Sequence, residues 1–177
     1  MTRDRLAEAI YRRSLLRGRF VLRSGQVSDR YFDKYLFESE PELLAAIAEA
    51  MVPLVPDGVD AIAGLELGGI PLAVMLSQRT GLPTRFVRKK AKEYGTCRLA
   101  EGGEVEGLRL LVVEDVITSG GQVVLSSQDL RGLGARVEQA LCVIDREAGG
   151  APNLAEAGVR LTPLFTMSEL ERAAAGG

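Results

Sequence analysis

The sequence predicts an α/β protein built on a parallel sheet with helices on both faces. Short apolar segments rich in β-branched residues alternate with segments of helical periodicity, and most of the connections between them are short. The apolar run Leu110–Val113 lacks the polar alternation of a half-exposed strand, which is typical of a strand covered on both faces. With 177 residues, the chain has the length of one domain. We therefore expect residues 1–177 to form a single domain.

Residues 1–38 precede this alternation and predict a helix followed by a hairpin, which together we call the hood. Tyr31 and Phe32 are adjacent in the second strand of this hairpin, so their side chains should point to opposite faces. One ring can then pack into the core while the other stacks on a flat ligand, although two packing rings are an equally good interpretation. The expected elements of the hood are a helix at Arg3–Arg17 and strands at Phe20–Arg23 and Arg30–Tyr35.

The rest of the chain supplies the alternating strands and helices. Glycine, proline and capping residues mark the boundaries between them. The expected elements are a helix at Glu42–Leu54, a strand at Asp60–Gly64, a helix at Ile70–Thr80, strands at Thr84–Arg88 and from Leu108, a helix at Gln122–Leu133, strands at Val137–Ile144 and Val159–Phe165, and a helix at Met167–Ala174 with Ser168 as its N-cap.

The composition excludes several classes of protein. A net charge of −2 indicates neither a nucleic-acid nor an anionic-membrane partner, and we expect no membrane span and no secretory signal. The two cysteines, Cys97 and Cys142, do not make a disulfide framework, so a reducing cytoplasm is the expected location. Histidine is absent, which excludes His-dependent triads and His-ligated metals. The expected metal is Mg²⁺, held mainly by substrate oxygens and water together with carboxylates.

The stretch Leu110–Gly121 (LLVVEDVITSGG) is the strongest indication of a binding site. Glu114 and Asp115 follow the buried strand, and ligands of open α/β sheets bind beyond the carboxyl ends of the strands. The turn at residues 118–121 leads into a helix, whose free N–H groups and dipole attract a phosphate. Two carboxylates beside a phosphate-binding turn suit a ribose 5-phosphate. The alternative is an ordinary strand-to-helix turn with solvated acids.

Two further segments add candidate contacts. The polar stretch 89–107 is longer than most structureless loops of compact domains, and a cluster of cations opens it, so we expect a mobile loop that covers a phosphate site. A solvated loop or a surface hairpin is the alternative. Arg146 follows the next strand and should lie on the same rim as Glu114 and Asp115, where its guanidinium suits a carboxylate or ring carbonyls, or pairs with a neighbouring acid. The loop Leu65–Gly69 could bind a second phosphate, but a plain tight turn is the default interpretation.

Several stretches resemble one family in the same order and at similar separations. FVLRSGQVSDRYFD, GLELGGIPLA, RKKAKEYGT, VVEDVITSGG and IDREAGG are together similar to the orotate phosphoribosyltransferases, which belong to the type I phosphoribosyltransferases. The resemblance covers roughly Phe20 to Gly150. It implies a type I phosphoribosyltransferase-like sheet with an N-terminal hood and a long flexible catalytic loop. It also implies Mg²⁺-dependent transfer of ribose 5-phosphate from phosphoribosyl diphosphate to orotate, in pyrimidine biosynthesis, by a homodimer.

The resemblance also assigns roles to individual residues. Loop residues would reach phosphates largely across the dimer interface, and the catalytic set would be Lys92, Asp115, Glu114 and Arg88. Phosphoribosyl diphosphate would contact Arg88, Lys89, Lys92, Tyr94, Glu114, Asp115, Val116, Ile117, Thr118, Ser119, Gly120, Gly121 and Gln122. Orotate would contact Thr118 and Arg146, with Tyr31 and Phe32 as candidate stacking residues.

The chain departs from the family pattern at three positions. Val27 stands where many members carry a lysine, and Gly68 stands where some carry a lysine that binds pyrophosphate. Tyr94 replaces a histidine of some members, which removes an imidazole but keeps a hydrogen-bond donor. Two other functions stay open. One is transfer to a purine or another pyrimidine, and the other is a regulatory protein that senses phosphoribosyl diphosphate.

Overall fold

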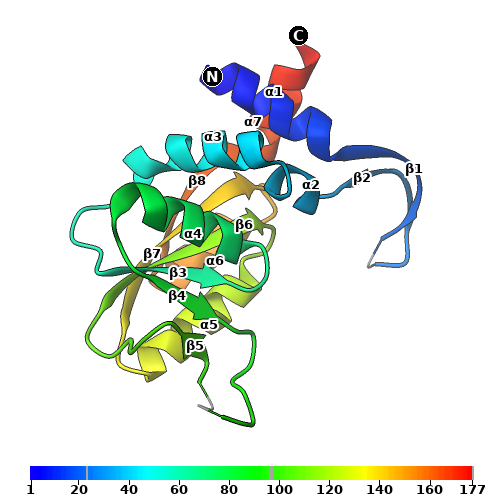
Figure 1. Ribbon diagram of the computed structural model, residues 1–177. Coiled ribbons are helices and arrows are strands. Elements are labelled where there is room, and N and C mark those ends of the chain that lie inside the picture. The colour runs from blue at the N-terminus through cyan, green and yellow to red at the C-terminus, as the bar shows by residue number, and fades with distance from the viewer. Residues whose placement is uncertain (23, 96–97, 177) are drawn as a thin grey trace.

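A six-stranded sheet forms the centre of the protein, for which a computed structural model describes residues 1–22, 24–95 and 98–176. Its strands are β3 (Ala61–Leu65), β4 (Thr84–Val87), β5 (Ala100–Glu101), β6 (Arg109–Ile117), β7 (Arg136–Asp145) and β8 (Arg160–Thr166). The order is β5-β4-β3-β6-β7-β8, and every neighbouring pair is parallel except β4 and β5 (Figure 1). The expected α/β architecture with a mostly parallel sheet is therefore confirmed.

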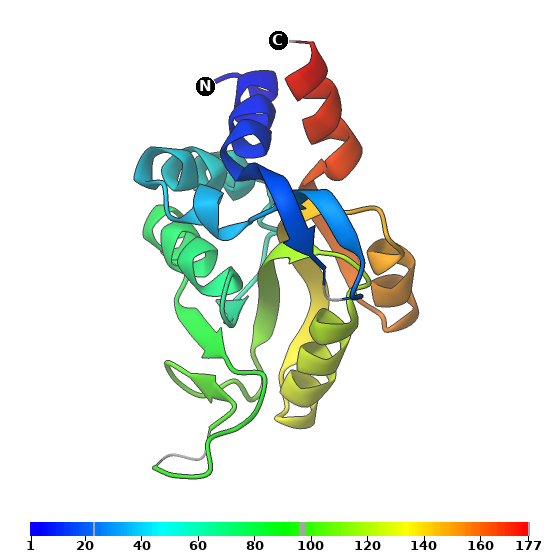
Figure 2. The ribbon, with the colours of Figure 1, turned by 90° about the vertical axis from the view of Figure 1, so that its right-hand side faces the viewer.

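Helices cover both faces of the sheet. They are α3 (Pro41–Met51), which continues into a 3-10 turn (Val52–Leu54), α4 (Gly69–Thr80), α5 (Gly121–Gly132) and α6 (Gly150–Glu156). Neighbouring residues of a strand point to opposite sides, so each buried strand contributes side chains to a hydrophobic core on each face of the sheet. On β6, Leu111 and Val113 pack with α3 and α4, whereas Leu110 and Val112 pack with α5 and α6. Figure 2 shows α3 and α4 on one side of the sheet and α5 and α6 on the other.

The hood consists of α1 (Arg3–Ser14), β1 (Leu15–Val21), β2 (Val27–Phe32) and α2 (Tyr35–Glu38). The first helix ends at Ser14 and not at Arg17, because Leu15 already pairs with Phe32 in the antiparallel hairpin. The hairpin therefore begins and ends earlier than the sequence predicts, and Arg23 lies outside the described residues. Figure 2 shows the hairpin in front of the sheet, on the side from which β3 and β6 present their carboxyl ends.

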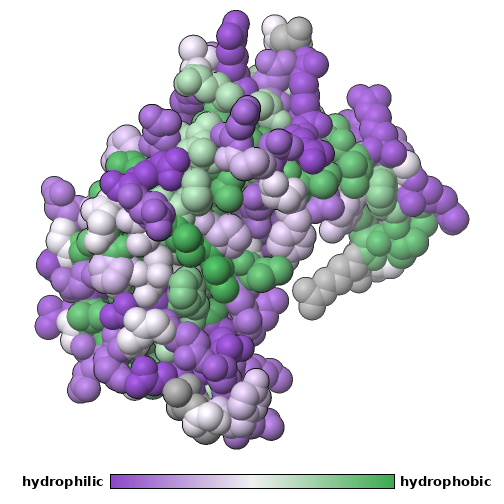
Figure 3. All heavy atoms as spheres, viewed as in Figure 1, coloured by the Kyte–Doolittle hydropathy of each residue, from purple (hydrophilic) through white to green (hydrophobic). Residues whose placement is uncertain are grey.

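Apolar side chains lie on the surface of this hairpin (Figure 3). Val21 is 72% exposed and Val27, which stands at one of the family's lysine positions, is 56% exposed. The hairpin touches the rest of the hood through its ends, so its tip depends on few buried contacts. Local stability is lowest where apolar burial is sparse, so we expect the tip of the hairpin to open more readily than the sheet.

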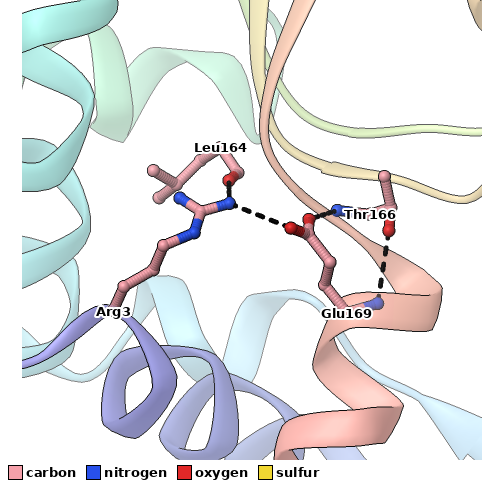
Figure 4. A network of polar contacts seen from close by, with 4 residues as sticks. All are labelled: Arg3, Leu164, Thr166 and Glu169. Atoms are coloured by element: carbon pink, nitrogen blue, oxygen red, sulfur yellow. Dashed lines mark hydrogen bonds and ion pairs between the residues drawn. The ribbon is translucent and has the colours of Figure 1, made fainter.

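The chain ends with α7 (Met167–Ala175), which packs beside α1 and brings the two termini together (Figure 1). Thr166, and not the expected Ser168, is the N-cap of α7, because its hydroxyl accepts from the Glu169 N–H in a capping box. Arg3 joins the two helices. Its guanidinium donates to the Leu164 carbonyl at 2.6 Å and pairs with Glu169 at 3.3 Å (Figure 4).

Three elements outside the hood also differ from the sequence-based expectation. β6 continues through Glu114 and Asp115 to Ile117, so these acids belong to a strand and not to the loop after it. The helix α6 was not predicted, since its seven residues begin with Gly-Ala-Pro and show no clear periodicity. The stretch 89–107 contains β5, which pairs with β4, so it is a surface hairpin at its base. Among the described residues, no helix is both long and apolar enough to span a bilayer.

Candidate functional site

The candidate site lies at the carboxyl edge of the sheet, where β3, β6 and β7 end. The hairpin of the hood and the long loop after β4 both project on this side (Figures 1 and 2). Three loops meet at the edge. They are the Gly68–Gly69 turn after β3, the Thr118–Gly121 turn after β6 and the Asp145–Glu147 segment after β7. This arrangement matches the general location of ligand sites in open α/β sheets.

The pleat of β6 gives the two acids different surroundings. Asp115 shares its face with Leu111 and Val113 and is fully buried beneath the hood, whereas Glu114 points the other way and is partly exposed. The two oxygens of Asp115 are both engaged. Oδ1 accepts from the Val116 N–H at 2.5 Å, and Oδ2 lies 2.6 Å from the ammonium group of Lys34.

The acids therefore differ in charge. Burial opposes ionisation of Asp115, but hydrogen bonds with Glu38 and Glu114 and the ammonium group of Lys34 together hold its pKa below the usual range. Burial, followed by the negative charge of Asp115, raises the pKa of Glu114 to about 8. Burial and the hydrogen bond with Asp115 raise the pKa of Glu38 to about 9. At neutral pH, Asp115 carries the negative charge of this cluster.

The turn after β6 is shaped to receive an anion. Thr118 and Ser119 are exposed, and Gly120 has a left-handed backbone (φ +76°) that directs the chain into α5. The first N–H groups of this 12-residue helix face the turn with no side-chain cap. The helix α6 supports the turn from behind, since the Asn153 amide donates to the Ser119 carbonyl at 2.8 Å. The predicted Gln122 lies in the first turn of α5 and donates to Ser126 Oγ at 3.1 Å.

Two of the predicted cations of the long loop pair with an acid other than Glu114 and Asp115. Arg88 and Lys92 both pair with Glu101 of β5, at 3.6 Å for Arg88 Nε. The hydrogen bond and charge of Lys92 lower the pKa of Glu101. The Lys89 N–H donates to Glu66 Oε1 at 2.5 Å, and Tyr94 is 75% exposed. Two of the four loop residues, Arg88 and Lys92, are thus ion-paired with Glu101 of their own hairpin.

Three of the four predicted base-binding residues meet at one cavity. A cavity of about 340 Å³ is lined by Tyr31, Phe32 and Arg146, together with residues of α1, the hairpin and α7. Phe32 packs toward the core beside Tyr11, with ring centroids 6.3 Å apart, whereas Tyr31 stacks on Phe20 on the outside of the hairpin. The opposite orientation of the two rings is as expected. Thr118 is not among the described residues that line the cavity.

The position of Arg146 depends on its neighbour Glu147. Glu147 has a positive φ of 57° and accepts from the Ser168 N–H at 2.9 Å, and its side-chain hydrogen bond with Ser168 lowers its pKa. The Arg146 N–H donates to the Ile117 carbonyl at 2.9 Å. These bonds fix the backbone on both sides of Arg146 and leave its guanidinium exposed.

The donor set fits a hard cation that is held mainly by its ligand. Within the described residues, no three His, Cys, Asp or Glu side chains are arranged as a metal site. Asp115 is committed to Lys34, so Glu114 is the accessible carboxylate of the pair. Since its pKa is raised to about 8, Glu114 would have to lose its proton to ligate Mg²⁺, which would take its other ligands from substrate and water.

Sequence reasoning missed Lys34, Glu38 and Glu101. The motif DKYLFE contains two of them, but only the docking of α2 onto β6 shows that they reach Asp115. Gly68 was noted only for its missing side chain. A Cβ atom there would lie 1.6 Å from Asp115 Oδ2, so the turn after β3 lies directly on this acid.

Comparisons with known proteins all point to one family. The Phosphoribosyl transferase domain matches residues 37–161. The chain is 52% identical over 162 residues to an orotate phosphoribosyltransferase of a Nocardioides species, which covers 92% of this chain and 90% of the relative. It is 45% identical to the orotate phosphoribosyltransferase of Halobacterium salinarum, with 86% and 87% of the two chains covered. The solved Mycobacterium tuberculosis orotate phosphoribosyltransferase in complex with 5-phospho-alpha-D-ribosyl 1-diphosphate is 30% identical and superposes with a TM-score of 0.82, covering 96% and 98% of the chains.

Proposed function

This chain belongs to the phosphoribosyl transferase domain family, and from that membership we propose that it makes orotidine 5′-phosphate and pyrophosphate from orotate and phosphoribosyl diphosphate. The reaction serves pyrimidine biosynthesis. The single observation that carries the proposal is the corner formed by Glu114, Asp115 and the turn at residues 118–121, at the carboxyl edge of the sheet. The aromatic and arginine-lined cavity beside it supplies a place for a flat anionic base.

The geometry suggests how the chain carries out the transfer. Breaking the C1–O bond of the sugar leaves positive charge on the ribose and negative charge on the departing diphosphate. Glu114 can meet the sugar hydroxyls, and the buried charge of Asp115 favours the cationic ribose from below. The turn at residues 118–121 holds the 5-phosphate through backbone N–H groups, and Arg146 can meet the carboxylate of orotate.

Mg²⁺ and the loop cations would act on the diphosphate. Glu114 is the residue that would contact Mg²⁺, which when bound neutralises charge that develops on the leaving group. Arg88, Lys89, Lys92 and Tyr94 would reach the same group when the loop closes and excludes water. To do so, Arg88 and Lys92 must leave Glu101.

A homodimer in which the loop serves the partner's site is part of the proposal. In their own chain, Arg88 and Lys92 pair with Glu101 and not with Glu114, and in a dimer they would instead serve the site of a second copy. Apolar side chains gather in the middle of one face, near the start of α4 (Figure 3), where Leu67 is 62% exposed and Val74 is 37% exposed. Such a surface suits an interface with another copy. A cytoplasmic location is also proposed, since the buried Cys142 is a free thiol.

A direct assay tests the proposal. Purified protein is mixed with orotate, phosphoribosyl diphosphate and Mg²⁺, and the loss of orotate absorbance is followed against a mixture without phosphoribosyl diphosphate. Turnover of adenine, hypoxanthine or uracil but not orotate would assign the chain to another base. Binding of phosphoribosyl diphosphate without turnover, together with salt-sensitive binding of nucleic acid, would indicate a sensing protein.

Asp115→Asn tests the corner itself. We expect the variant to fold and to use phosphoribosyl diphosphate poorly, because it loses the one negative charge of the cluster. Its kcat/KM for phosphoribosyl diphosphate should fall by about 10²-fold, the scale of one strong electrostatic contact in a transition state. Unchanged kinetics would remove Asp115 from the site.

A further inference from the structure

A buried cluster of charged groups connects the hood to the sugar corner. Lys34 and Glu38 come from the start and the end of α2, and Asp115 comes from β6. The Lys34 ammonium lies 2.6 Å from Asp115 Oδ2, and the two side chains are 33% and 0% exposed. Glu38 is buried, and its carboxyl group interacts with that of Asp115. None of these contacts is needed to close the sheet, since β6 is already paired on both sides with β3 and β7.

The turn after β3 seals this cluster. A Cβ atom at Gly68 would lie 1.6 Å from Asp115 Oδ2 and 2.9 Å from Glu38 Oε1. The backbone of Gly68 and the ammonium of Lys34 therefore lie against the same oxygen of Asp115, with the Glu38 carboxyl beside them. The other oxygen is held by the Val116 N–H. Both oxygens of Asp115 are thus in contact with neighbouring groups, and Lys34 supplies the only cation among the described residues that pairs with it.

One ammonium group opposite two carboxyl groups fixes the charge of the cluster. Two buried carboxylates in contact cannot both remain ionised when a single cation faces them. Asp115 retains its charge beside Lys34, and Glu38 remains neutral because burial and its neighbour raise its pKa to about 9. Glu38 then donates its proton toward Asp115 and adds no second negative charge.

We propose that Lys34 is a positioning residue for phosphoribosyl transfer and that it holds the Asp115 carboxylate in place beneath the sugar. The inference rests on the proposed function, because Asp115 matters only if a sugar phosphate binds at this corner. Lys34 lies two residues after Phe32, which lines the aromatic cavity. The same short segment of the hood therefore lines the base pocket and orients the acid of the sugar site, which couples the two.

Replacement of Lys34 by methionine tests the inference, since methionine keeps much of the length and removes the charge. Lys34→Met should lower kcat/KM for phosphoribosyl diphosphate by about tenfold or more, the scale of one hydrogen bond to a charged group, while the KM for orotate changes less. Lys34→Arg should recover much of the loss. The matched control is Arg12→Met, which removes a cation of the same hood from a surface pair with Glu8 at 2.7 Å and should leave the kinetics unchanged.

A double-mutant cycle separates positioning from direct contact. In the Asp115→Asn background, Lys34→Met should cause less than about a twofold further loss, because residues that act through each other are not additive. The double variant removes both charges of the pair, so it remains measurable even if the single Lys34→Met variant folds poorly. Full additivity would overturn the inference and show that Lys34 meets the substrate by itself, and wild-type kinetics in Lys34→Met would overturn it as well.

Failure of the inference and failure of the proposed function give different results. If the wild-type chain turns over orotate while Lys34→Met matches it, the inference alone fails. If the wild-type chain does not turn over orotate, the proposed function fails. The Kd for phosphoribosyl diphosphate of the wild-type chain, the two single variants and the double variant is then measured by calorimetry. Non-additive losses of affinity support the role of Lys34, and equal affinities of Lys34→Met and the wild-type chain refute it.

Discussion

Within the turn at residues 118–121, Gly120 is the position where the structure restricts the side chain most. Its φ is +76°, and a Cβ atom there would lie 2.2 Å from Leu154 Cδ1, which is 1.2 Å short of the 3.4 Å at which ordinary contact begins. Leu154 belongs to α6 and is fully buried, so its side chain cannot move aside freely. The left-handed backbone should cost about 1–2 kcal/mol for alanine, and overpacking should add about 1–3 kcal/mol. We expect Gly120→Ala to lose about 2–5 kcal/mol of unfolding free energy in total.

The adjacent Gly121 provides a matched control. It begins α5 with an ordinary helical backbone, and its Cβ atom would meet nothing closer than Ser119 Oγ at 3.8 Å. Gly121→Ala should therefore stay within about 0.5 kcal/mol of the wild-type chain. The assay is urea unfolding at one fixed protein concentration, because a dimer would make stability depend on concentration. Equal stability of the two variants would show that the turn does not have this geometry. The displaced turn should also raise the KM for phosphoribosyl diphosphate in Gly120→Ala.

Three other predictions address the loop and the acids. Lys92→Ala should slow turnover by about 10²–10³-fold, and near-normal turnover would count against a catalytic role for Lys92. If the loop acts across a dimer, mixing Lys92→Ala with Asp115→Asn subunits should restore activity. No recovery would count against action across the dimer. Glu101→Gln should lower the KM for phosphoribosyl diphosphate severalfold by releasing Lys92, and a raised KM would show that Glu101 assists the closed loop. The raised pKa of Glu38 (about 9, from its usual 4.5) means that its stabilising contribution is complete below pH 4.5 and lost as the pH rises toward 9. Glu38→Gln should remove the Glu38 part of the slope, at most about 1.4 kcal/mol per pH unit in urea titrations, while the part from Glu114 remains. Equal slopes in the variant and the wild-type chain would refute the assignment.

Much of the fold follows from local patterns. The buried strands of the sheet have uninterrupted apolar runs, and the glycine-containing turns before α4 and α5 are visible in the sequence. Local sequence patterns predict the wrong element where pairing with a distant segment of the chain decides the secondary structure. Leu15 belongs to a strand because Phe32 lies opposite, although a helical pattern continues through it to Arg17. Similarly, β5 is a two-residue pairing inside a polar stretch, and no local signal marks such a short strand.

The candidate site was predictable in its position and less so in its electrostatics. Glu114, Asp115 and the turn after them were visible because chemistry-bearing residues follow an apolar strand. Their separation into one partly exposed and one buried acid was not, because it depends on β6 continuing through both residues. The cavity around Tyr31 and Arg146 brings together residues that are more than a hundred positions apart, which periodicity cannot show.

Adjacent acids in a strand acquire different roles because the pleat turns them to opposite faces. Glu114 reaches the edge, where its position suits contact with a ligand, whereas Asp115 is directed under the hood, where a cation must compensate its burial. Lys34 supplies that cation, and Gly68 has no Cβ where it approaches Asp115 and Glu38. A lysine side chain at position 68 would need Asp115 to turn elsewhere. This chain has Gly68 where some members of the family have a lysine. Its positive charge at the corner accordingly comes from Lys34 of the hood and not from the turn after β3.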